Sequence, residues 1–276
     1  MEVPLDLVAV MGVLNVTPDS FSDGGLWLDP GAAVAHGRAM VSEGAAIVDV
    51  GGQSTRPGAQ PVAEDEELRR VIPVISALAR EIKVPISIDT RTANVARAAL
   101  DAGASIVNDT AGEDSEPGMA ALVAGSGAAV VAMHSRGSPE TMVSLTIYSD
   151  VVKDVAAFLL ERADRLEAIG VHHDAIALDP GFGFAKTGDQ NLELLARFDE
   201  LTGFGFPVLA GTSRKSFIGR VLNTETGQRL EGTLATIVWA VAKGARIVRV
   251  HDVQQAVRAV RMTEAIENAV PREDRL

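Results

Sequence analysis

The sequence predicts a single-domain α/β protein built as a (β/α)8 TIM barrel, and three observations support this fold class. Eight short runs rich in Val, Ile, Leu and Ala recur along the 276 residues, with helical patterns between them. Such continuous apolar runs suit parallel strands that are buried on both faces. No Pro-, Gly- or Ser-rich linker divides the chain. The runs also end on polar or charged residues, and the active site of such a barrel lies where its strands end.

The expected strands follow one another at regular intervals along the chain, at residues 8–16, 47–50, 84–88, 106–107, 128–133, 175–178, 207–210 and 247–250. Helices are expected between them at 65–79, 92–102, 151–169, 191–198 and 232–242. The helix at 65–79 has an acidic start, as the helix dipole prefers, and one apolar face made of Leu68, Val71, Ile72, Ile75 and Leu78.

Four glycines precede strands in a repeated Gly-Ala pattern and indicate the turns at the opposite end of the barrel: Gly44, Gly103, Gly127 and Gly244. Glycine can adopt the left-handed conformation that ends a helix. Two longer connections, at about 17–30 and 51–64, combine Gly and Pro with hydroxyl and charged residues. We expect them to be mobile active-site loops of one domain that spans 1–276 and ends in a short polar tail.

The composition excludes several classes of partner and chemistry. The chain has 25 Lys and Arg against 37 Asp and Glu, a net charge of −12, which disfavours nucleic acids and anionic membranes as partners. It contains no Cys, which excludes disulfides and cysteine catalysis. No apolar stretch approaches the roughly 18 residues of a membrane span, and the first residues do not resemble a signal peptide. We therefore expect a cytoplasmic protein.

Three polar residues at strand ends, Asp89, Asn108 and Asp179, are expected to converge at the barrel mouth. Two carboxylates and an amide suit a flat heterocycle with several N–H donors and carbonyl acceptors, such as a pterin. Phe184, in the Gly-rich segment after Asp179, could form a wall for a ring. The alternative is an internal salt-bridge network with Lys186, Lys215 or Arg214.

Basic residues gather after the seventh and eighth strands, at Arg214, Lys215, Arg249 and His251. This quarter of such barrels often binds phosphate, so an anionic small molecule is expected there. Ser213 is expected to cap a helix that starts at this point, and the alternative is a capped helix with a solvated Arg-Lys pair. Asn15 offers a hard oxygen that suits Mg²⁺, although an Asn at a strand end can also be structural. His134 lies at the expected mouth and could be either functional or structural.

Eight segments together make the chain closely resemble the dihydropteroate synthases, the folate-pathway enzymes that sulfonamides inhibit: 11–25, 47–58, 86–90, 106–109, 133–139, 178–186, 212–216 and 249–252. These segments cover every expected strand end in order. The resemblance implies a Mg²⁺-dependent transferase. In its reaction 4-aminobenzoate attacks the methylene of a dihydropterin diphosphate, a C–N bond forms, and diphosphate leaves.

The resemblance also implies roles for particular residues. Catalytic roles would fall to Asp23, Arg56, Lys215, Arg249 and His251, and the metal ligand would be Asn15. Substrate contacts would come from Phe21, Thr55, Pro57, Asp89, Asn108, Met133, Asp179, Phe184, Lys215, Ser216, Arg249, Val250 and His251. The diphosphate would be held by Thr55, Arg56, Arg249 and His251.

The sequence departs from the family pattern at two positions: Gln53 stands where Glu is usual, and Ser135 replaces a bulkier residue. Two other interpretations remain open, the pterin-binding barrel of a corrinoid-dependent methyltransferase and a catalytically silent relative that binds pterin or a protein. A homodimer through the apolar helix expected at 232–242 is a further hypothesis.

Overall fold

Eight parallel strands form the centre of the molecule. The computed structural model describes residues 7–17, 30–54, 58–115 and 117–269. Within them the strands are β1 (Ala9–Asn15), β2 (Ile47–Gly51), β3 (Ile86–Thr90), β4 (Ile106–Asp109), β5 (Ala129–Met133), β6 (Ile176–Asp179), β7 (Leu209–Ala210) and β8 (Ile247–Val250). They pair in the order β6-β5-β4-β3-β2-β1-β8-β7. A parallel bridge between Leu178 and Val208 joins the two ends of this sheet. The predicted (β/α)8 barrel is confirmed.

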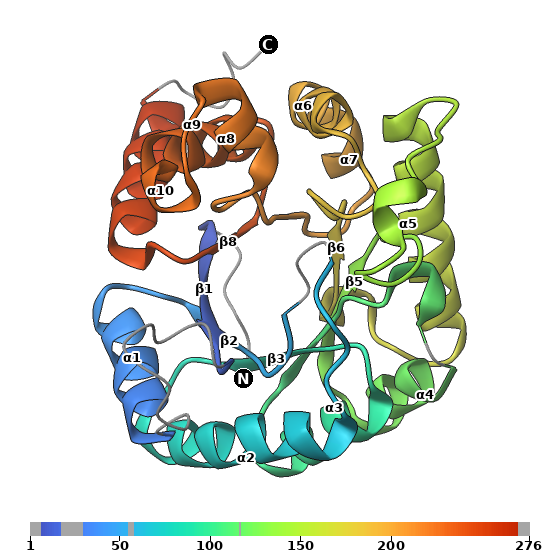
Figure 1. Cartoon of the computed structure of the whole chain (residues 1–276), viewed down its shortest axis with the longest axis vertical. Coiled ribbons are helices and arrows are strands. Elements are labelled where there is room, and N and C mark those ends of the chain that lie inside the picture. The colour runs from blue at the N-terminus through green and yellow to red at the C-terminus, as the bar shows by residue number, and fades with distance from the viewer. Residues whose placement is uncertain (1–6, 18–29, 55–57, 116, 270–276) are drawn as a thin grey trace.

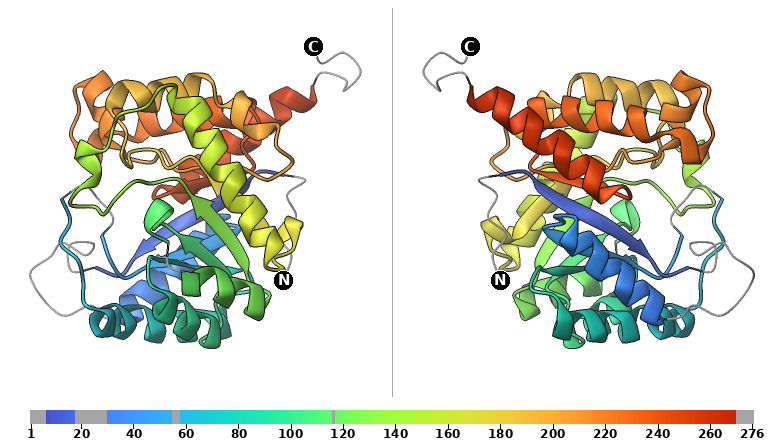
Figure 2. Two further views of the ribbon diagram at one scale, coloured as in Figure 1. Left: turned by 90° about the vertical axis from the view of Figure 1, so that its right-hand side faces the viewer. Right: turned by 90° about the vertical axis from the view of Figure 1, so that its left-hand side faces the viewer.

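Helices surround the strands on all sides, as Figures 1 and 2 show. In the described part of the chain they are α1 (Pro30–Ser42), α2 (Glu64–Glu81), α3 (Ala93–Asp101), α4 (Pro117–Ser126), α5 (Val151–Ala168), α6 (Gly188–Ala196), α7 (Asp199–Thr202), α8 (Ser216–Leu222), α9 (Leu230–Ala242) and α10 (Val253–Asn268). None of the helices in these ranges is long and apolar enough to cross a membrane.

The helix predicted at 65–79 matches α2, whereas the helix predicted at 191–198 starts too late for α6. The first turn of α2 is acidic, and the helix buries Val71, Ile75 and Leu78 against the strands. Helix α6 begins at Gly188 and not at Asn191, because Thr187 and Gln190 form a reciprocal capping box. In this box the Gln190 backbone N–H donates to Thr187 Oγ1 at 3.2 Å, and the Thr187 N–H donates to Gln190 Oε1 at 2.8 Å.

The four glycines of the repeated pattern do have left-handed backbones, with φ of 104° at Gly44, 114° at Gly103, 71° at Gly127 and 97° at Gly244. Each follows a helix and precedes a strand. The predicted turns at the N-terminal end of the barrel are therefore confirmed, and they leave the opposite end for the chemistry.

Two apolar layers hold the barrel. The larger one lies between the strands and the helices. The smaller one fills the inside of the barrel and consists of Ala9, Met11, Ile47, Ile106, Val131, Ala177, Leu209 and Ile247. Because side chains alternate between the two faces of a strand, the residues two positions further along point into the barrel as well. These include polar residues on β2, β4, β6 and β8.

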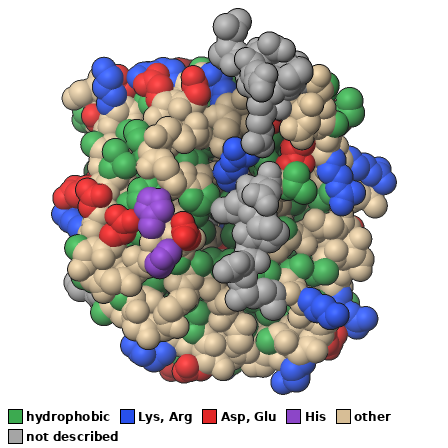
Figure 3. Space-filling view, turned by 180° about the vertical axis from the view of Figure 1, so that it is seen from behind, with side chains coloured by type: hydrophobic (Ala, Val, Ile, Leu, Met, Phe, Trp, Pro, Cys, Tyr) green, Lys and Arg blue, Asp and Glu red, His purple; other side chains and the backbone are tan. Residues whose placement is uncertain are grey.

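The outer surface carries charges of both signs. On the face opposite to the viewer of Figure 1, acidic and basic side chains are interspersed around the edge, with hydrophobic side chains between them (Figure 3). Among the described side chains of that face, both signs of charge are visible.

Candidate active site

Four buried polar side chains and one half-buried arginine form a layer above the apolar interior of the barrel. This polar layer consists of Asp49 on β2, Asp89 on β3, Asn108 on β4, Asp179 on β6 and Arg249 on β8. The four acidic and amide residues are at most 6% exposed. The parallel register aligns Asp89 with Asn108 across β3 and β4. The predicted convergence of Asp89, Asn108 and Asp179 at the ends of their strands is what the structure shows.

Arg249 lies among the carboxylates of the polar layer. Its Nε donates to Asp49 Oδ2 at 2.6 Å, and its Nη2 donates to Asp89 Oδ2 at 2.7 Å. Asp49 Oδ2 also accepts from Asn108 Nδ2 at 3.2 Å. Buried carboxylates require such partners. The salt-bridge network that the sequence left open therefore exists, and Arg249 is the cation that pairs with Asp49 and Asp89 in it.

Asp49 is the member of the polar layer that the sequence analysis missed. It lies inside an apolar run, between Val48 and Val50, where the run alone predicts only a buried strand. A charged residue in a run that is buried on both faces is itself a signal, because it must point to a partner or a ligand. Its side chain is 0% exposed and points into the barrel beside Arg249.

Two oxygen atoms in this layer have no hydrogen-bond partner within the described ranges, Asp49 Oδ1 and Asn108 Oδ1. Both are buried acceptors, and a buried acceptor without a donor is costly. A ligand that brings N–H groups into the barrel mouth would satisfy them. This pair of atoms is the strongest structural indication of a binding site for a nitrogen heterocycle.

Two carboxylates of the layer, those of Asp89 and Asp179, have raised pKa values. Burial, opposed mainly by the charge of Arg249, raises the pKa of Asp89 to about 6. Burial also raises the pKa of Asp179, although the Gly181 N–H donates to Asp179 Oδ1 at 2.7 Å and acts in the opposite direction. Lys215 lowers both pKa values, so it lies near both carboxylates. Perturbed acids gathered at a barrel mouth are typical of functional sites.

Lys215 and Phe184 face each other across the edge of the site. Lys215 Nζ lies 4.2 Å from the centre of the Phe184 ring, within the range of a cation–π contact. Phe184 is buried and packs with Met133, Met142 and Ala185. The predicted site residues Lys215, Phe184 and Met133 thus lie on one side of the mouth. Ser216 is exposed at the first position of α8.

The predicted cap by Ser213 is wrong. Helix α8 begins at Ser216, and its N-cap position is occupied by Lys215 without a side-chain hydrogen bond. Ser213 Oγ instead lies 3.0 Å from His251 Nδ1 and accepts the backbone N–H of His251 at 3.2 Å. Arg214 is not a solvated cation either, since it makes a two-pronged ion pair with Asp252.

His251 does not supply the positive charge that its position suggested. Burial, together with Arg249 and Arg214, lowers its pKa to about 3, so the imidazole is neutral at physiological pH. Its neighbour Val250 is buried at the end of β8. A neutral His251 can hold a ligand only through a hydrogen bond.

Asn15 ends β1, half-buried and beside β2. A Cβ added to Gly51 would lie 3.7 Å from Asn15 Oδ1, so that oxygen faces the start of the loop after β2. No group of three His, Cys, Asp or Glu residues within the described ranges could hold a metal ion. One amide oxygen without a protein cage fits Mg²⁺, which keeps most of its waters and takes phosphate oxygens from a substrate.

Several predicted site residues lie outside the described residues, namely Phe21, Asp23, Thr55, Arg56 and Pro57. The two departures from the family pattern can be located: Gln53 is half-buried after β2, and Ser135 is buried next to His134. The Ser135 carbonyl accepts the Glu113 N–H at 2.9 Å.

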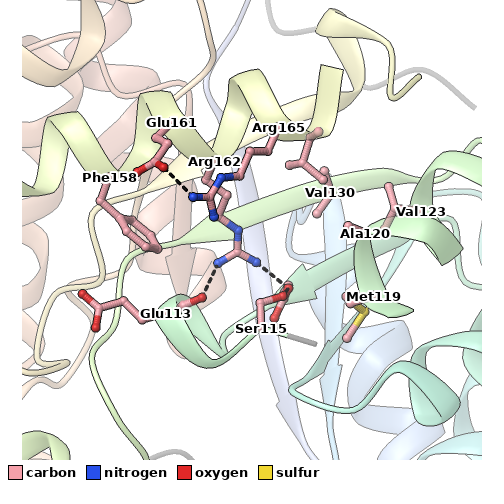
Figure 4. Close-up of a pocket in the computed structure, with 13 residues that line it drawn as sticks. Glu113, Ser115, Met119, Ala120, Val123, Val130, Phe158, Glu161, Arg162 and Arg165 are labelled. Carbon is pink, nitrogen blue, oxygen red and sulfur yellow. Dashed lines mark hydrogen bonds and ion pairs between the residues drawn. The ribbon is translucent and has the colours of Figure 1, made fainter. Parts of the chain in front are cut away.

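A cavity of about 300 Å³ lies outside the barrel, between α4 and α5, as Figure 4 shows. Its charged residues are already paired: Arg162 contacts Asp109, and Arg165 contacts Glu161. It contains none of the predicted site residues. We therefore assign the candidate active site to the barrel mouth and not to this cavity.

Comparisons with known proteins agree with the geometry. The family model described as "Pterin binding enzyme" matches residues 11–251. The dihydropteroate synthase of Synechocystis sp. is 49% identical over 258 residues, which cover 93% of this chain and 89% of that protein. The chain belongs to the dihydropteroate synthase family. The resemblance found in the sequence is thereby confirmed.

Solved structures of the family share the whole fold. The Yersinia pestis dihydropteroate synthase in complex with a sulfonamide drug superimposes with a TM-score of 0.92 at 43% identity, with 97% of each chain covered. The Xanthomonas albilineans dihydropteroate synthase in complex with 7,8-dihydropteroate superimposes with a TM-score of 0.87 at 42% identity, covering 97% of this chain and 96% of that one.

Proposed function

We propose that this chain condenses (7,8-dihydropterin-6-yl)methyl diphosphate with 4-aminobenzoate to give 7,8-dihydropteroate and diphosphate, a step of folate biosynthesis. Family membership at 49% identity to a dihydropteroate synthase supports the reaction class, a transferase that forms a carbon–nitrogen bond. The observation that carries the proposal is the polar layer at the barrel mouth, in which two buried acceptor oxygens have no donor among the described residues.

The pterin ring would lie against the polar layer. The amino and ring N–H groups of an aminopyrimidinone would donate to Asp49 Oδ1, Asn108 Oδ1 and the carboxylates of Asp89 and Asp179. Lys215, near those carboxylates, would donate to a ring acceptor. Because the layer is buried, each such bond is worth more than it would be in water.

The amine nitrogen of 4-aminobenzoate would attack the pterin methylene carbon. The new C–N bond forms while the C–O bond to diphosphate breaks, and the attacking nitrogen then loses a proton. Asp89, Asp179 and Asp49 place negative charge under the ring and stabilise positive character at the methylene. The leaving diphosphate would be held by Thr55 and Arg56, with charge from Arg249 and a hydrogen bond from the neutral His251. Phe21, Asp23, Pro57, Phe184 and Ser216 would enclose the aminobenzoate.

Mg²⁺ would be the cofactor, bound by Asn15 together with diphosphate oxygens. When bound, it would neutralise charge on the leaving group. Among the described residues, the contribution of the protein at this point is the side-chain oxygen of Asn15, with a glycine neighbour, Gly51, that leaves room beside it.

A homodimer would fit the apolar surface of α8 and α9. Val221 and Leu222 are 59% and 45% exposed, and Val238 and Trp239 are 39% and 50% exposed. Exposed apolar groups of this kind are typical of subunit interfaces. Light scattering should give twice the chain mass of 28.9 kDa, and a monomeric mass would contradict the dimer.

The test of the proposed function is incubation of the chain with the dihydropterin diphosphate, 4-aminobenzoate and Mg²⁺. We expect equal amounts of dihydropteroate and diphosphate, with a sulfonamide competing against 4-aminobenzoate. A folded chain that makes no product but binds pterin would instead support the silent-relative interpretation. A chain that accepts methyl-bearing pterins would support the methyltransferase interpretation.

A further inference from the structure

The loop that joins β6 to α6, residues 180–187, is held by a buried lysine that the mechanism above does not use. Lys186 is 8% exposed, and its Nζ has three close neighbours. It lies 2.9 Å from His134 Nδ1, 3.1 Å from the Gly181 carbonyl oxygen and 3.0 Å from the Phe184 carbonyl oxygen. The Lys186 side chain thus links two carbonyl groups of the loop, those of Gly181 and Phe184, to His134 at the end of β5.

The backbone of this loop needs such support. Gly181, Gly183 and Ala185 all have positive φ, of 67°, 79° and 47°. For Ala185 this conformation is strained, because its Cβ approaches the backbone carbonyl. The Ala185 carbonyl accepts a hydrogen bond from Tyr148 Oη at 2.9 Å. Lys186 and Tyr148 therefore bind neighbouring carbonyls in the strained part of the loop.

The loop carries groups of the active site at both of its ends. At its start, the Gly181 N–H donates to Asp179 of the polar layer. Near its end, the Phe184 ring lies 4.2 Å from Lys215 Nζ. A Cβ on Gly183 would be 3.0 Å from Lys215 Cδ, so the loop backbone also contacts the Lys215 side chain. Any shift of the loop would move Phe184 relative to Lys215.

His134 completes the arrangement on the side of β5. Its ring lies 5.0 Å from the Phe158 ring and 6.0 Å from the Tyr148 ring, and its Nε2 has no hydrogen-bond partner within the described ranges. A charged Lys186 donates to all three neighbours. A neutral Lys186 donates to the two carbonyls and accepts the Nδ1 proton of His134. All three contacts persist in either form.

We propose that Lys186, His134 and Tyr148, here called the Lys186 junction, position the β6–α6 loop so that Phe184 forms the wall of the site for the aromatic amine substrate. Lys186 is a positioning residue in this proposal, since it acts through the loop. The proposal rests on the proposed function for the identity of the amine, 4-aminobenzoate.

The test compares Lys186→Met and Tyr148→Phe with the wild-type chain. In Lys186→Met we expect KM for 4-aminobenzoate to rise about tenfold while kcat changes less than about threefold, since a displaced Phe184 weakens binding of the amine. Tyr148→Phe removes one bond and should shift the same KM about threefold. The matched control is Lys153→Met, at an exposed lysine on α5, which should leave both constants unchanged.

Hydrogen exchange of the backbone amides in residues 181–187 gives a second readout that needs no activity. We expect faster exchange there in both junction variants and not in the control. A folded Lys186→Met chain with wild-type KM and wild-type exchange overturns the proposal. If Lys186→Met does not fold, Tyr148→Phe decides by the same two measurements. A wild-type chain that makes no dihydropteroate contradicts the proposed function instead, and exchange then decides on the junction alone.

Discussion

The side chain of Asp49 holds two other members of the polar layer, Arg249 and Asn108, through one carboxylate oxygen. Its second oxygen is free of partners in the described part of the chain and faces a ligand in the proposed function. Asp49 thus combines a positioning role with a binding role. Asn has nearly the same shape as Asp but carries no charge. The Asp49→Asn variant therefore removes the charge at this position while it preserves the packing.

For Asp49→Asn we expect a loss of about 2 kcal/mol in transition-state stabilisation, a fall of about 30-fold in kcat/KM, because Arg249 loses one of its two buried carboxylate partners. Steady-state kinetics and calorimetric binding of a pterin measure this change. The control is Asp101→Asn, at an exposed carboxylate that ends α3. Equal kcat/KM in both variants would remove Asp49 from the site.

Lys186 should make stability depend on pH. Burial, reinforced by Arg136 and Lys215 and opposed by Asp179, lowers its pKa from 10.5 to about 7. Between these two values the unfolded chain binds a proton that the folded chain does not, so the free energy of unfolding rises with pH by up to about 1.4 kcal/mol per unit. Below about pH 7 this contribution is lost.

Urea denaturation at several pH values from 7.5 to 9.5 measures this slope. The wild-type chain should gain stability with rising pH relative to Lys186→Met, which lacks the titrating group. Parallel curves for the two proteins would show that Lys186 titrates normally.

At the residue scale, the sequence identified those groups whose position alone determines their role. Asp89, Asn108 and Asp179 end buried strands, so their convergence follows from the barrel. The pairing of Arg249 and the neutral state of His251 depend on neighbours far away in the chain. For Arg249 the partners Asp49 and Asp89 are 200 and 160 residues distant. No local pattern could have predicted them.

At the scale of elements, the β6–α6 loop packs against the end of β5 at a glycine. A Cβ on Gly181 would lie 2.0 Å from the His134 carbonyl oxygen, and its φ of 67° disfavours any other residue. The loop can therefore approach β5 closely only because Gly181 has no side chain. This contact places Asp179 and Phe184 relative to the mouth.

Gly181→Ala should lower the free energy of unfolding by at least about 3 kcal/mol, since both the backbone and its neighbour must move. Gly170→Ala is the matched control: its φ is 99°, but nothing lies within 4 Å of the added Cβ, so it should cost only about 1 kcal/mol. Urea denaturation compares the two. Equal losses in the free energy of unfolding for the two variants would mean that the loop can move away from β5 at little cost.

Strand positions were predicted to within a few residues because apolar runs and strand burial coincide. Helix starts were less certain. The sequence placed a cap at Ser213, although that hydroxyl is used by His251, and it overlooked the capping box of Thr187 and Gln190. Capping depends on which side chains compete for a hydroxyl, and that competition is decided by tertiary contacts.

At the scale of the whole molecule, the closed order of the strands explains why one end of the barrel carries the chemistry. β1 pairs with both β2 and β8, so residues from the two ends of the chain meet at the same mouth. The apolar interior below them excludes water from that side. The polar layer therefore lies on an apolar floor, and this is where the proposed function places the flat pterin ring.

The most direct test is a crystal structure of the chain soaked with a pterin. We predict that the ring lies at the barrel mouth, with its N–H groups donating to Asp49 Oδ1 and Asn108 Oδ1 and its plane near Lys215. A pterin bound in the cavity between α4 and α5, or a barrel mouth left empty at saturating ligand, would contradict it.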